Sequence, residues 1–275
     1  MLKIGTKILL TLSLSFAAVA PAFGGPGLTE IADGAHRSEE HKARNGARHP
    51  VETLNFFGLQ ADMTVVEIHP GNKGWYTEVL APYLEEKGTY VAMGHPRDSE
   101  NKDIQRGYEV FDKKLASNPM YSKALTAEIR NAKAEGIALG SADMVLTFRN
   151  VHNFITHDRN PDGMFEMFHD LLKPGGILGV VQHRDSPETV QGPLGERGYL
   201  TEDVVIALAE KAGFKLVAKS EINANPKDTK DHPYGVWTLP PTLYHEEENA
   251  DPSKWIAIGE SDRMTLKFIK SDKPS

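Results

Sequence analysis

Polar and charged side chains that could bind a small molecule follow the apolar segment Thr64–Ile68, which carries one acid, Glu67. His69 comes next, and Gly71 and Gly74 then form a turn in front of a helix-like run. Such a junction brings backbone N–H groups and a helix N-terminus close to a carboxylate. This pattern suits a ligand that has a polar end and ribose hydroxyls.

Two further apolar segments deliver polar residues in the same way. Arg149, Asn150 and His152 follow the segment 142–148, and His183 follows the segment 176–182. Where strands of a sheet end, the edge is concave and backbone groups are unsatisfied, so these residues form a candidate site. An ion pair is the common alternative role for Arg149, and a structural hydrogen bond is the common one for His152.

The elements that must position these residues alternate between strand and helix beyond residue 58. The alternation predicts an α/β fold with a doubly wound, mostly parallel sheet and helices on both faces. Ligands in such sheets bind beyond the carboxyl ends of the strands. The predicted strands are Thr64–Ile68, Thr89–Gly94, Asp143–Phe148, Gly176–Gln182, Lys215–Glu221 and Met264–Ile269, and the predicted helices are Pro50–Gly58, Trp75–Glu86, Lys123–Lys133, Gly163–Leu172 and Thr201–Ala212.

The first 24 residues have the pattern of a secretory signal peptide. Lys3 and Lys7 precede the apolar run Ile8–Ala20, and a small-x-small cleavage pattern closes at Gly24. The run is too short for a stable membrane anchor, and no later segment is long and apolar enough to span a bilayer. We therefore expect a periplasmic or secreted protein with an N-terminal helical arm at 25–60 and one domain at 61–275, which contains an insertion at 223–262.

Composition narrows the class of partner. The chain has 31 basic and 38 acidic residues, and loss of Lys3 and Lys7 raises the acidic excess from 7 to 9. An acidic chain without a basic run of the kind that follows a phosphate backbone argues against nucleic acid as a partner. The absence of cysteine excludes disulfides, thiolate metal sites and cysteine nucleophiles. About 250 residues suit one large core.

Two segments could shape a binding site. The stretch from His36 to Pro50 is rich in arginine, lysine and histidine, so it could cover an anionic site or form a solvated helix face. The insertion 223–262 could form a substrate lid with Tyr234, Trp237 and Tyr244 as walls, or a hairpin that covers a sheet edge.

Several other chemistries lack their motifs. The sequence has no G-x-S-x-G, H-E-x-x-H, G-x-x-x-x-G-K-[ST] or G-x-G-x-x-G pattern, which serine hydrolases, zinc proteases, P-loop proteins and dinucleotide dehydrogenases use. The histidine pairs at spacing five do not share a helix face, so we predict no helix-borne metal site.

The order of these motifs resembles that of class I S-adenosylmethionine-dependent methyltransferases, and more narrowly that of the exported, predicted methyltransferases of bacteria. The resemblance runs from R-H-P-V-E-T-L-N-F-F-G-L through V-V-E-I-H-P-G and W-Y-T-E-V-L-A-P-Y-L to D-M-V-L-T-F-R-N-V-H-N-F and L-K-P-G-G-I-L. It implies a seven-stranded Rossmann-like sheet whose last strand, Met264–Ile269, is an antiparallel edge strand.

The resemblance also implies S-adenosyl-L-methionine as cofactor. Glu67 matches the acid that closes the first strand, and Gly71 and Gly74 match glycines of the cofactor loop. His69 stands where many members have glycine, so it adds bulk or, if protonated, a charge. The second strand leads to His95 and not to the usual ribose-binding carboxylate, and Asp98 is the first acid after it. We also count His69, His95 and Arg149 among the candidate cofactor contacts.

Methyl transfer from a sulfonium needs positioning and, for a hydroxyl or amine acceptor, a base. His152 is the first choice for that base, His183 is the second, and Asn150 lies beside them. We expect methyl transfer to a small-molecule acceptor. A non-catalytic periplasmic binding protein on the same fold is the alternative, because adenosylmethionine is made in the cytoplasm. The sequence indicates no oligomeric state.

Overall fold

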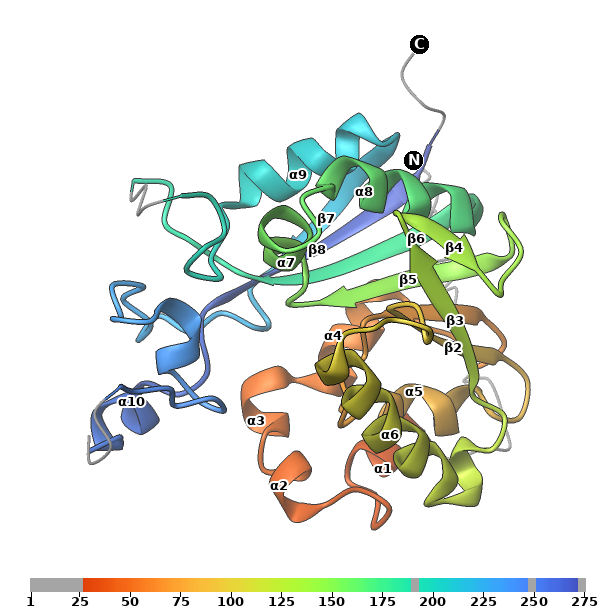
Figure 1. Cartoon of the computed structure of the whole chain (residues 1–275), viewed down its shortest axis with the longest axis horizontal. Helices are drawn as coiled ribbons and strands as arrows, with labels where there is room; N and C mark the ends of the chain where they lie inside the picture. The colour runs from red at the N-terminus through yellow and green to blue at the C-terminus, as the bar shows by residue number, and fades with distance from the viewer. Residues whose placement is uncertain (1–26, 189–192, 247–250, 272–275) are drawn as a thin grey trace, which may run out of the picture.

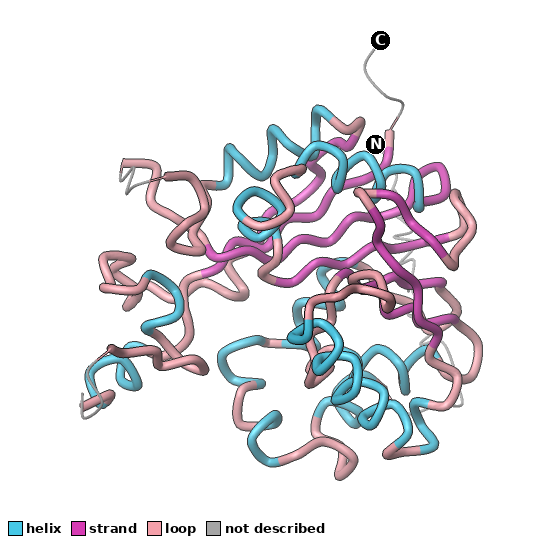
Figure 2. The backbone as a smooth tube through the Cα atoms, viewed as in Figure 1, coloured by secondary structure: helices cyan, strands magenta, loops and turns pink. Residues whose placement is uncertain are grey.

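A twisted eight-stranded sheet runs through the computed structural model, which describes residues 27–188, 193–246 and 251–271 (Figures 1 and 2). The predicted signal peptide, residues 1–24, lies outside the described residues. None of the helices in the described ranges has the length and hydropathy needed to cross a membrane.

The centre of the sheet is β1 (Thr64–Ile68), which pairs in parallel with β2 (Thr89–Gly94) and β5 (Ala142–Phe148). The sheet order is β4-β3-β2-β1-β5-β6-β8-β7. The side chains of β1 and β5 are nearly all buried, as expected for strands covered on both faces. The other strands are β3 (Leu125–Arg130), β4 (Lys133–Glu135), β6 (Leu172–His183), β7 (Phe214–Ser220) and β8 (Arg263–Lys270).

The doubly wound, mostly parallel sheet with an antiparallel last strand is confirmed, but two details differ from the prediction. The sheet has eight strands because the short β4 pairs with β3 as a hairpin. The last strand, β8, is antiparallel to both β6 and β7 and lies between them. The edge on that side is therefore β7 and not β8.

Helices cover both faces (Figure 1). On one face, α7 (Val151–Thr156), α8 (Pro161–Leu171) and α9 (Glu202–Lys211) contribute to one apolar core. On the other, the N-terminal helices together with α5 (Thr77–Leu84) and α6 (Lys102–Ala116) build a second core. The remaining helices are α1 (Leu28–Ala32), α2 (Glu39–Lys42), α3 (Asn45–Arg48), α4 (Pro50–Phe57), α10 (Ser253–Ile258) and the short 3-10 helices η1 (Pro119–Tyr121) and η2 (Gly235–Thr238).

The predicted helix Lys123–Lys133 is wrong, because most of this segment forms β3. Its side chains from Ala127 to Arg130 alternate between buried and half-buried, which is a strand period. The sequence analysis also missed α6, which is largely polar and buries only Phe111. The Asn101 side chain caps α6 by accepting a hydrogen bond from the Asp103 N–H.

The N-terminal helices lie directly against the sheet. A Cβ at Gly179 of β6 would approach Leu146 to 2.6 Å and the Phe57 ring to 2.9 Å, so glycine permits α4 to pack closely. His49 adopts a left-handed conformation with φ of 40°, which ends α3 and starts α4. The arm thereby reaches the carboxyl ends of the strands.

Candidate functional site

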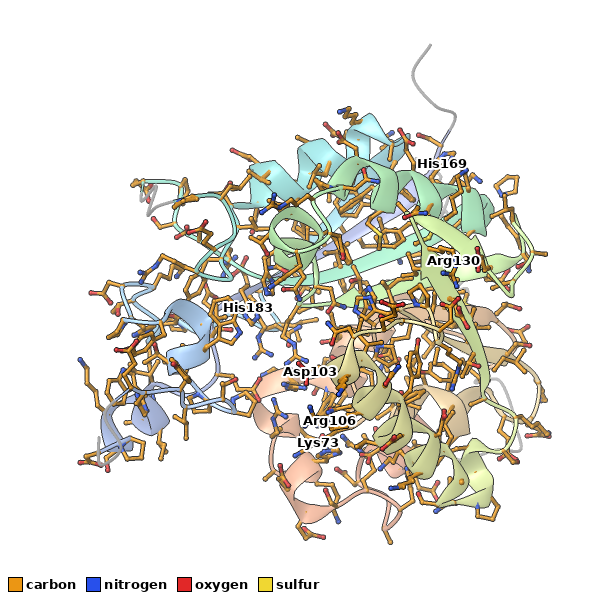
Figure 3. All side chains as sticks on the ribbon, in the orientation of Figure 1. Lys73, Asp103, Arg106, Arg130, His169 and His183 are labelled. Atoms are coloured by element: carbon orange, nitrogen blue, oxygen red, sulfur yellow. The ribbon has the colours of Figure 1, made fainter. Side chains whose placement is uncertain are left out.

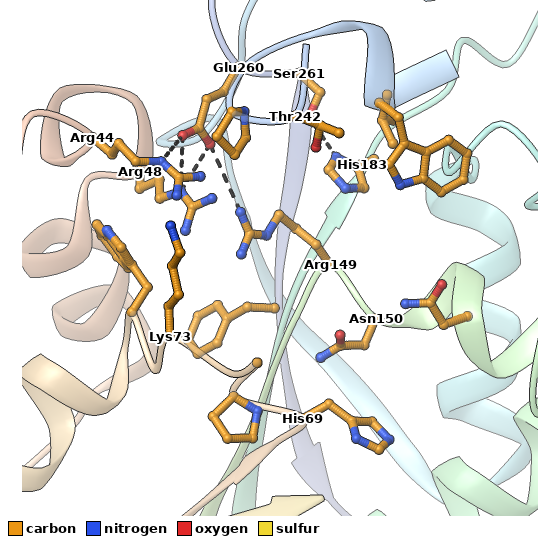
Figure 4. Close-up of a pocket in the computed structure, with 18 of the residues that line it drawn as sticks. Arg44, Arg48, His69, Lys73, Arg149, Asn150, His183, Thr242, Glu260 and Ser261 are labelled. Atoms are coloured by element: carbon orange, nitrogen blue, oxygen red, sulfur yellow. Dashed lines mark hydrogen bonds and ion pairs between the residues drawn. The ribbon is translucent and has the colours of Figure 1, made fainter. Parts of the chain in front are cut away.

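A cavity of about 610 Å³ opens at the carboxyl ends of β1, β5 and β6 (Figure 4). One wall comes from the N-terminal arm, and the opposite wall comes from the segment between β7 and β8. Basic, histidine, aromatic and other polar side chains line it, among them Arg44, Arg48, His69, Lys73, Trp75, Phe148, Arg149, Asn150, His152, His157, His183, Trp237, Glu260 and Ser261.

Four arginines gather around Glu260 at this cavity. Arg44 Nε lies 2.7 Å from Glu260 Oε1, and Arg48 Nε lies 2.9 Å from Oε2. Arg263 Nη1 lies 3.1 Å from Oε2, and Arg149 Nη1 lies 4.0 Å from it. We call Arg44, Arg48, Arg149, Arg263 and Glu260 the arginine cluster. Figure 4 labels four of these residues, all except Arg263, and marks their contacts with Glu260 by dashed lines.

Arg149 is held in an uncommon conformation at the end of β5. Its φ is 64°, and its N–H donates to the Val181 carbonyl of β6 at 2.6 Å. Burial lowers the pKa of Arg149 to about 10, while Glu260 opposes the shift and Arg263 adds to it. The guanidinium therefore stays charged at neutral pH inside a crowded cationic environment.

Glu67 closes β1 just before the turn and does not line the cavity. Its Oε2 accepts hydrogen bonds from the Tyr90 hydroxyl at 2.6 Å and from the Thr77 hydroxyl at 3.4 Å. Burial raises the pKa of Glu67 to about 7, even though these hydrogen bonds lower it. The carboxyl group is thus directed at β2 and α5, where it braces the turn.

The turn after β1 presents open backbone donors. Gly71 and Gly74 have φ of 73° and 56°, and a Cβ at Gly71 would meet nothing within 4 Å. Among the described residues, the N–H groups of Gly71, Asn72 and Lys73 make no hydrogen bond, and all three residues line the cavity. Unsatisfied N–H groups ahead of a helix form a site for a polar or anionic group.

His69 enters the turn with φ of 47°. Its ring lies 4.3 Å from the His95 ring and 6.1 Å from the Phe154 ring, measured between centroids. Burial and the neighbouring His95 lower the pKa of His69 to about 3. His69 is therefore neutral at physiological pH and supplies bulk without a counter-charge.

Beyond β2, His95 lines two neighbouring cavities of about 330 and 480 Å³, which also include His69. Asp98 lines neither cavity; its carboxylate accepts a hydrogen bond at 2.8 Å from Arg130 (Figure 3), which lines the larger of the two. The acid that lines the 330 Å³ cavity is Asp103, in the first turn of α6. Sequence reasoning missed Asp103 because α6 itself was not recognised.

His152 is buried in α7 and hydrogen-bonded to Gln182. The Gln182 amide is oriented by its other partners: Oε1 accepts from the Val151 N–H, and Nε2 donates to the Gly198 carbonyl. Gln182 Nε2 then also donates to His152 Nδ1 at 3.2 Å, which assigns the imidazole proton to Nε2. Burial lowers the pKa of His152 to about 4. In this arrangement, the Nε2 of His152 is a hydrogen-bond donor.

His183 and Asn150 each make a side-chain hydrogen bond near the floor of the cavity. His183 Nδ1 lies 2.6 Å from the Ser261 hydroxyl, and an Nδ1 proton donated to this oxygen leaves a lone pair on Nε2. Burial, together with His152 and Arg149, lowers the pKa of His183 well below its usual value. Asn150 donates from Nδ2 to the Ile68 carbonyl at 2.9 Å, which ties β5 to β1.

The arm is anchored to α5 by buried charge. Glu78 of α5 accepts hydrogen bonds from Arg37 at 3.1 Å, from His41 at 2.9 Å and from Lys114. The guanidinium carbons of Arg37 and Arg48 lie 4.7 and 4.8 Å from the centroid of the Trp75 indole. Within the basic stretch, Arg44 and Arg48 therefore line the cavity and Arg37 and His41 pack against α5, while residues 38–40 are exposed.

The segment between β7 and β8 forms the opposite wall. Trp237 lines the main cavity, whereas Tyr234 and Tyr244 line a separate one of about 470 Å³ with it. Buried Asp228 fixes the segment by accepting hydrogen bonds from the Tyr199 hydroxyl, His232 Nε2 and the Asp262 N–H.

The cavity brings together His69, Gly71, Gly74, Arg149, Asn150, His152 and His183 of the predicted site residues. Glu67 and His95 do not line it. The sequence analysis missed Glu260 and did not single out Arg44 or Arg48 as site residues; their basic surroundings were the available signal. No group of three or more potential metal ligands is found in the part of the chain that the structure describes.

Neither the models of known protein families nor the curated proteins match this sequence. Solved structures do resemble its fold. A SAM-dependent methyltransferase from Aquifex aeolicus has a TM-score of 0.53 and 18% identity, covering 71% of this chain and 91% of that one. Geranyl diphosphate C-methyltransferase from Streptomyces coelicolor, solved with S-adenosyl-L-homocysteine, has a TM-score of 0.55 and 12% identity, with coverages of 90% and 88%.

The [4+2]-cyclase SpnF is also similar, with a TM-score of 0.58 and 14% identity over 87% of this chain and 86% of that one. The chain therefore has the Rossmann-like methyltransferase fold. Because the similar structures include a cyclase as well as methyltransferases, the reaction has to be argued from the site itself.

Proposed function

We propose that this protein transfers a methyl group from S-adenosyl-L-methionine to a small-molecule acceptor bound in the 610 Å³ cavity. The observation that carries the proposal is the turn after β1, where three residues that line this cavity have N–H groups without a hydrogen-bond partner among the described residues. The methyltransferases of similar fold support the proposal.

The residues present fit this cofactor at the turn and less well beyond β2. Gly71, Asn72 and Lys73 would hold its polar end through their backbone N–H groups. No carboxylate closes β2, so Asp103 is the acid placed to meet ribose hydroxyls from α6. When bound, the cofactor supplies an electrophilic methyl group.

The protein's own contribution is to orient the acceptor, exclude water and accept a proton. The walls formed by Trp75, Phe148 and Trp237 enclose an apolar body. His183 Nε2 is the atom best suited to accept a proton from a hydroxyl or amine, because His152 carries its proton on Nε2. His152 and Asn150 would position the acceptor by hydrogen bonds.

Calorimetric titration of the purified protein with S-adenosylhomocysteine tests the proposal. We expect micromolar affinity, and we expect the Gly71→Val variant to bind at least tenfold more weakly because its side chain occupies the open approach to the turn. Gly140→Val is the matched control, since Gly140 also has a positive φ of 66° and open space, but lies at the opposite end of the sheet.

A non-catalytic ligand-binding protein is the second candidate. The missing carboxylate after β2 and the inward-directed Glu67 favour it. If neither adenosylhomocysteine nor adenosylmethionine binds, the protein is a binding protein for another ligand and not a methyltransferase.

We further propose that the protein is an exported member of the methyltransferase-fold proteins and works in the periplasm or outside the cell. The sequence of the first 24 residues supports this proposal. N-terminal sequencing of protein recovered from fractionated cells should begin near Gly25. Recovery of the full chain in the cytoplasmic fraction would contradict it.

A further inference from the structure

The arginine cluster carries more positive charge than its own carboxylate balances. Four guanidinium groups surround Glu260, and within the described ranges no other carboxylate forms an ion pair with any of them. Arg48, Arg263 and Glu260 are buried, so solvent screens these charges only weakly. A net charge of three positive units thus remains where the arm, the end of β5 and the segment before β8 meet beside the cavity.

Fold stability alone does not account for this arrangement. Like charges at close range in a buried site are unfavourable, and hydrophobic residues would fill the space at a lower cost. The hydrogen-bonding capacity of the cluster is also incomplete. Arg44 Nη2 is buried without a partner among the described residues, and Arg149 makes only its 4.0 Å contact with Glu260 there.

We propose that the arginine cluster binds an oxyanion, a carboxylate or phosphate group of the molecule that occupies the cavity. Guanidinium groups match both oxyanions because their planar N–H donors can form paired hydrogen bonds. This inference rests on the proposed function in one respect only: the proposed function identifies the molecule in the cavity as the methyl acceptor. The acceptor is then an anion.

The rest of the cavity defines the body of this anion. His69, His152 and His183 are neutral, so the cationic character is concentrated at the arginine cluster, with Lys73 at the rim beside Glu40. Trp75, Phe148 and Trp237 supply aromatic walls. A molecule with an oxyanion at one end and an apolar body therefore fits the cavity (Figure 4).

Titration of the full mature chain with benzoate, inorganic phosphate and benzamide tests the inference. Benzoate and benzamide have nearly the same shape, so the comparison isolates the oxyanion. We expect at least one of the two anions, benzoate and phosphate, to bind at least tenfold more tightly than benzamide. The stronger of the two anions identifies the oxyanion as carboxylate or phosphate.

Variants locate the binding to the arginine cluster. Arg44→Gln should weaken anion binding at least fivefold, and Glu260→Gln should strengthen it by removing the resident carboxylate. Arg159→Gln, at an exposed arginine outside the cavity, is the matched control. Arg44→Lys keeps the charge, so it should retain part of the affinity even if Arg44→Gln fails to fold.

Three results would overturn the inference. The first is benzamide binding as tightly as the stronger anion, and the second is no binding of either anion. The third is displacement of the bound anion by adenosylhomocysteine, because the cluster would then hold the cofactor's own carboxylate. Anion binding without any binding of adenosylhomocysteine would leave the oxyanion site standing and refute the methyltransferase proposal alone.

Discussion

At the scale of single residues, Glu67 shows how burial changes the role of a carboxylate. The acid closes β1 as the sequence indicates, yet its oxygens are taken up by Tyr90 and Thr77. A pKa of about 7 means that the group is substantially protonated near neutral pH in the folded protein. Its effect on a ligand is therefore exerted through the position of the turn.

Glu67→Gln should make the protein more stable in alkaline solution. Because the folded pKa is raised from 4.5 to about 7, folding favours the protonated form, and stability is lost as pH rises through 7. Glutamine resembles the protonated acid. Denaturant unfolding should show a gain of about 3 kcal/mol at pH 8, falling to near zero at pH 4.5.

Glu39→Gln on α2 is the control, since this carboxylate is 90% exposed. The unfolding free energy of the Glu39→Gln variant should equal that of the unmodified protein at every pH. Parallel profiles for Glu67→Gln and the unmodified protein would show that Glu67 is ionised in the fold.

His152 should exist as the neutral tautomer that carries its proton on Nε2. Nitrogen NMR of the imidazole should find Nδ1 unprotonated at pH 7 and should show titration only near pH 4, because burial lowers the pKa. Gln182→Met removes the donor to Nδ1 and should shift the tautomer equilibrium. An Nδ1–H signal in the unmodified protein would restore His152 as the first choice for a base.

At the scale of elements, ion pairs anchor the N-terminal arm to α5. Glu78 lies inside α5, and its pKa is about 2 because hydrogen bonds from His41 and Lys114 outweigh the effect of burial. The ionised Glu78 carboxylate therefore stabilises the folded protein above pH 4.5, and this stabilisation is lost as pH falls towards 2. The arm that carries Arg44 and Arg48 depends on this contact.

Glu78→Ala should release the arm. Removing a buried carboxylate leaves Arg37, His41 and Lys114 without their shared acceptor, which costs about 3–5 kcal/mol. Limited proteolysis should cut within residues 33–49 far faster than in the unmodified protein. Glu39→Ala, which breaks only an exposed pair with Lys42, should leave the cleavage rate unchanged.

Helices and strands whose apolar residues recur regularly were predictable from the sequence, whereas largely polar elements were not. Thr64–Ile68 was predicted within its observed bounds because a buried parallel strand is a continuous apolar run. Helix α6 buries only Phe111, so its pattern resembles a solvated loop. The segment at β3 was assigned to a helix because its first two residues, Leu125 and Thr126, are both exposed, which weakens the strand period.

The candidate site was predictable only where it lies on strand ends. Arg149 and Asn150 directly follow β5 and His183 is the last residue of β6, so topology places them at one edge of the sheet. Glu260 and Arg44 meet across 216 residues of sequence, and neither strand period nor motif encodes that contact. The direction of the Glu67 side chain likewise depends on Tyr90, which a strand pattern treats as an apolar residue.

At the scale of the whole molecule, an acidic protein with a sequence pI of about 5.9 encloses a cationic cavity wall. The overall charge repels anions, while the arginine cluster attracts them at short range. The proposed cofactor and acceptor sites would meet at the carboxyl ends of β1 and β5, but they would use different groups: backbone donors at the turn and guanidinium donors of the arginine cluster. The two sites should therefore fill independently.

Independent filling predicts that the two stabilising effects add. A ligand at 100 times its Kd stabilises the folded state by about 2.7 kcal/mol, which raises the Tm of a chain of this size by roughly 5–10 °C. Adenosylhomocysteine and benzoate together should give the sum of their separate shifts in calorimetric melting, and Gly71→Val should remove only the adenosylhomocysteine part. A combined shift no larger than the greater single one would mean that both ligands compete for the same position, and the cavity would then hold one ligand and not a donor and acceptor pair.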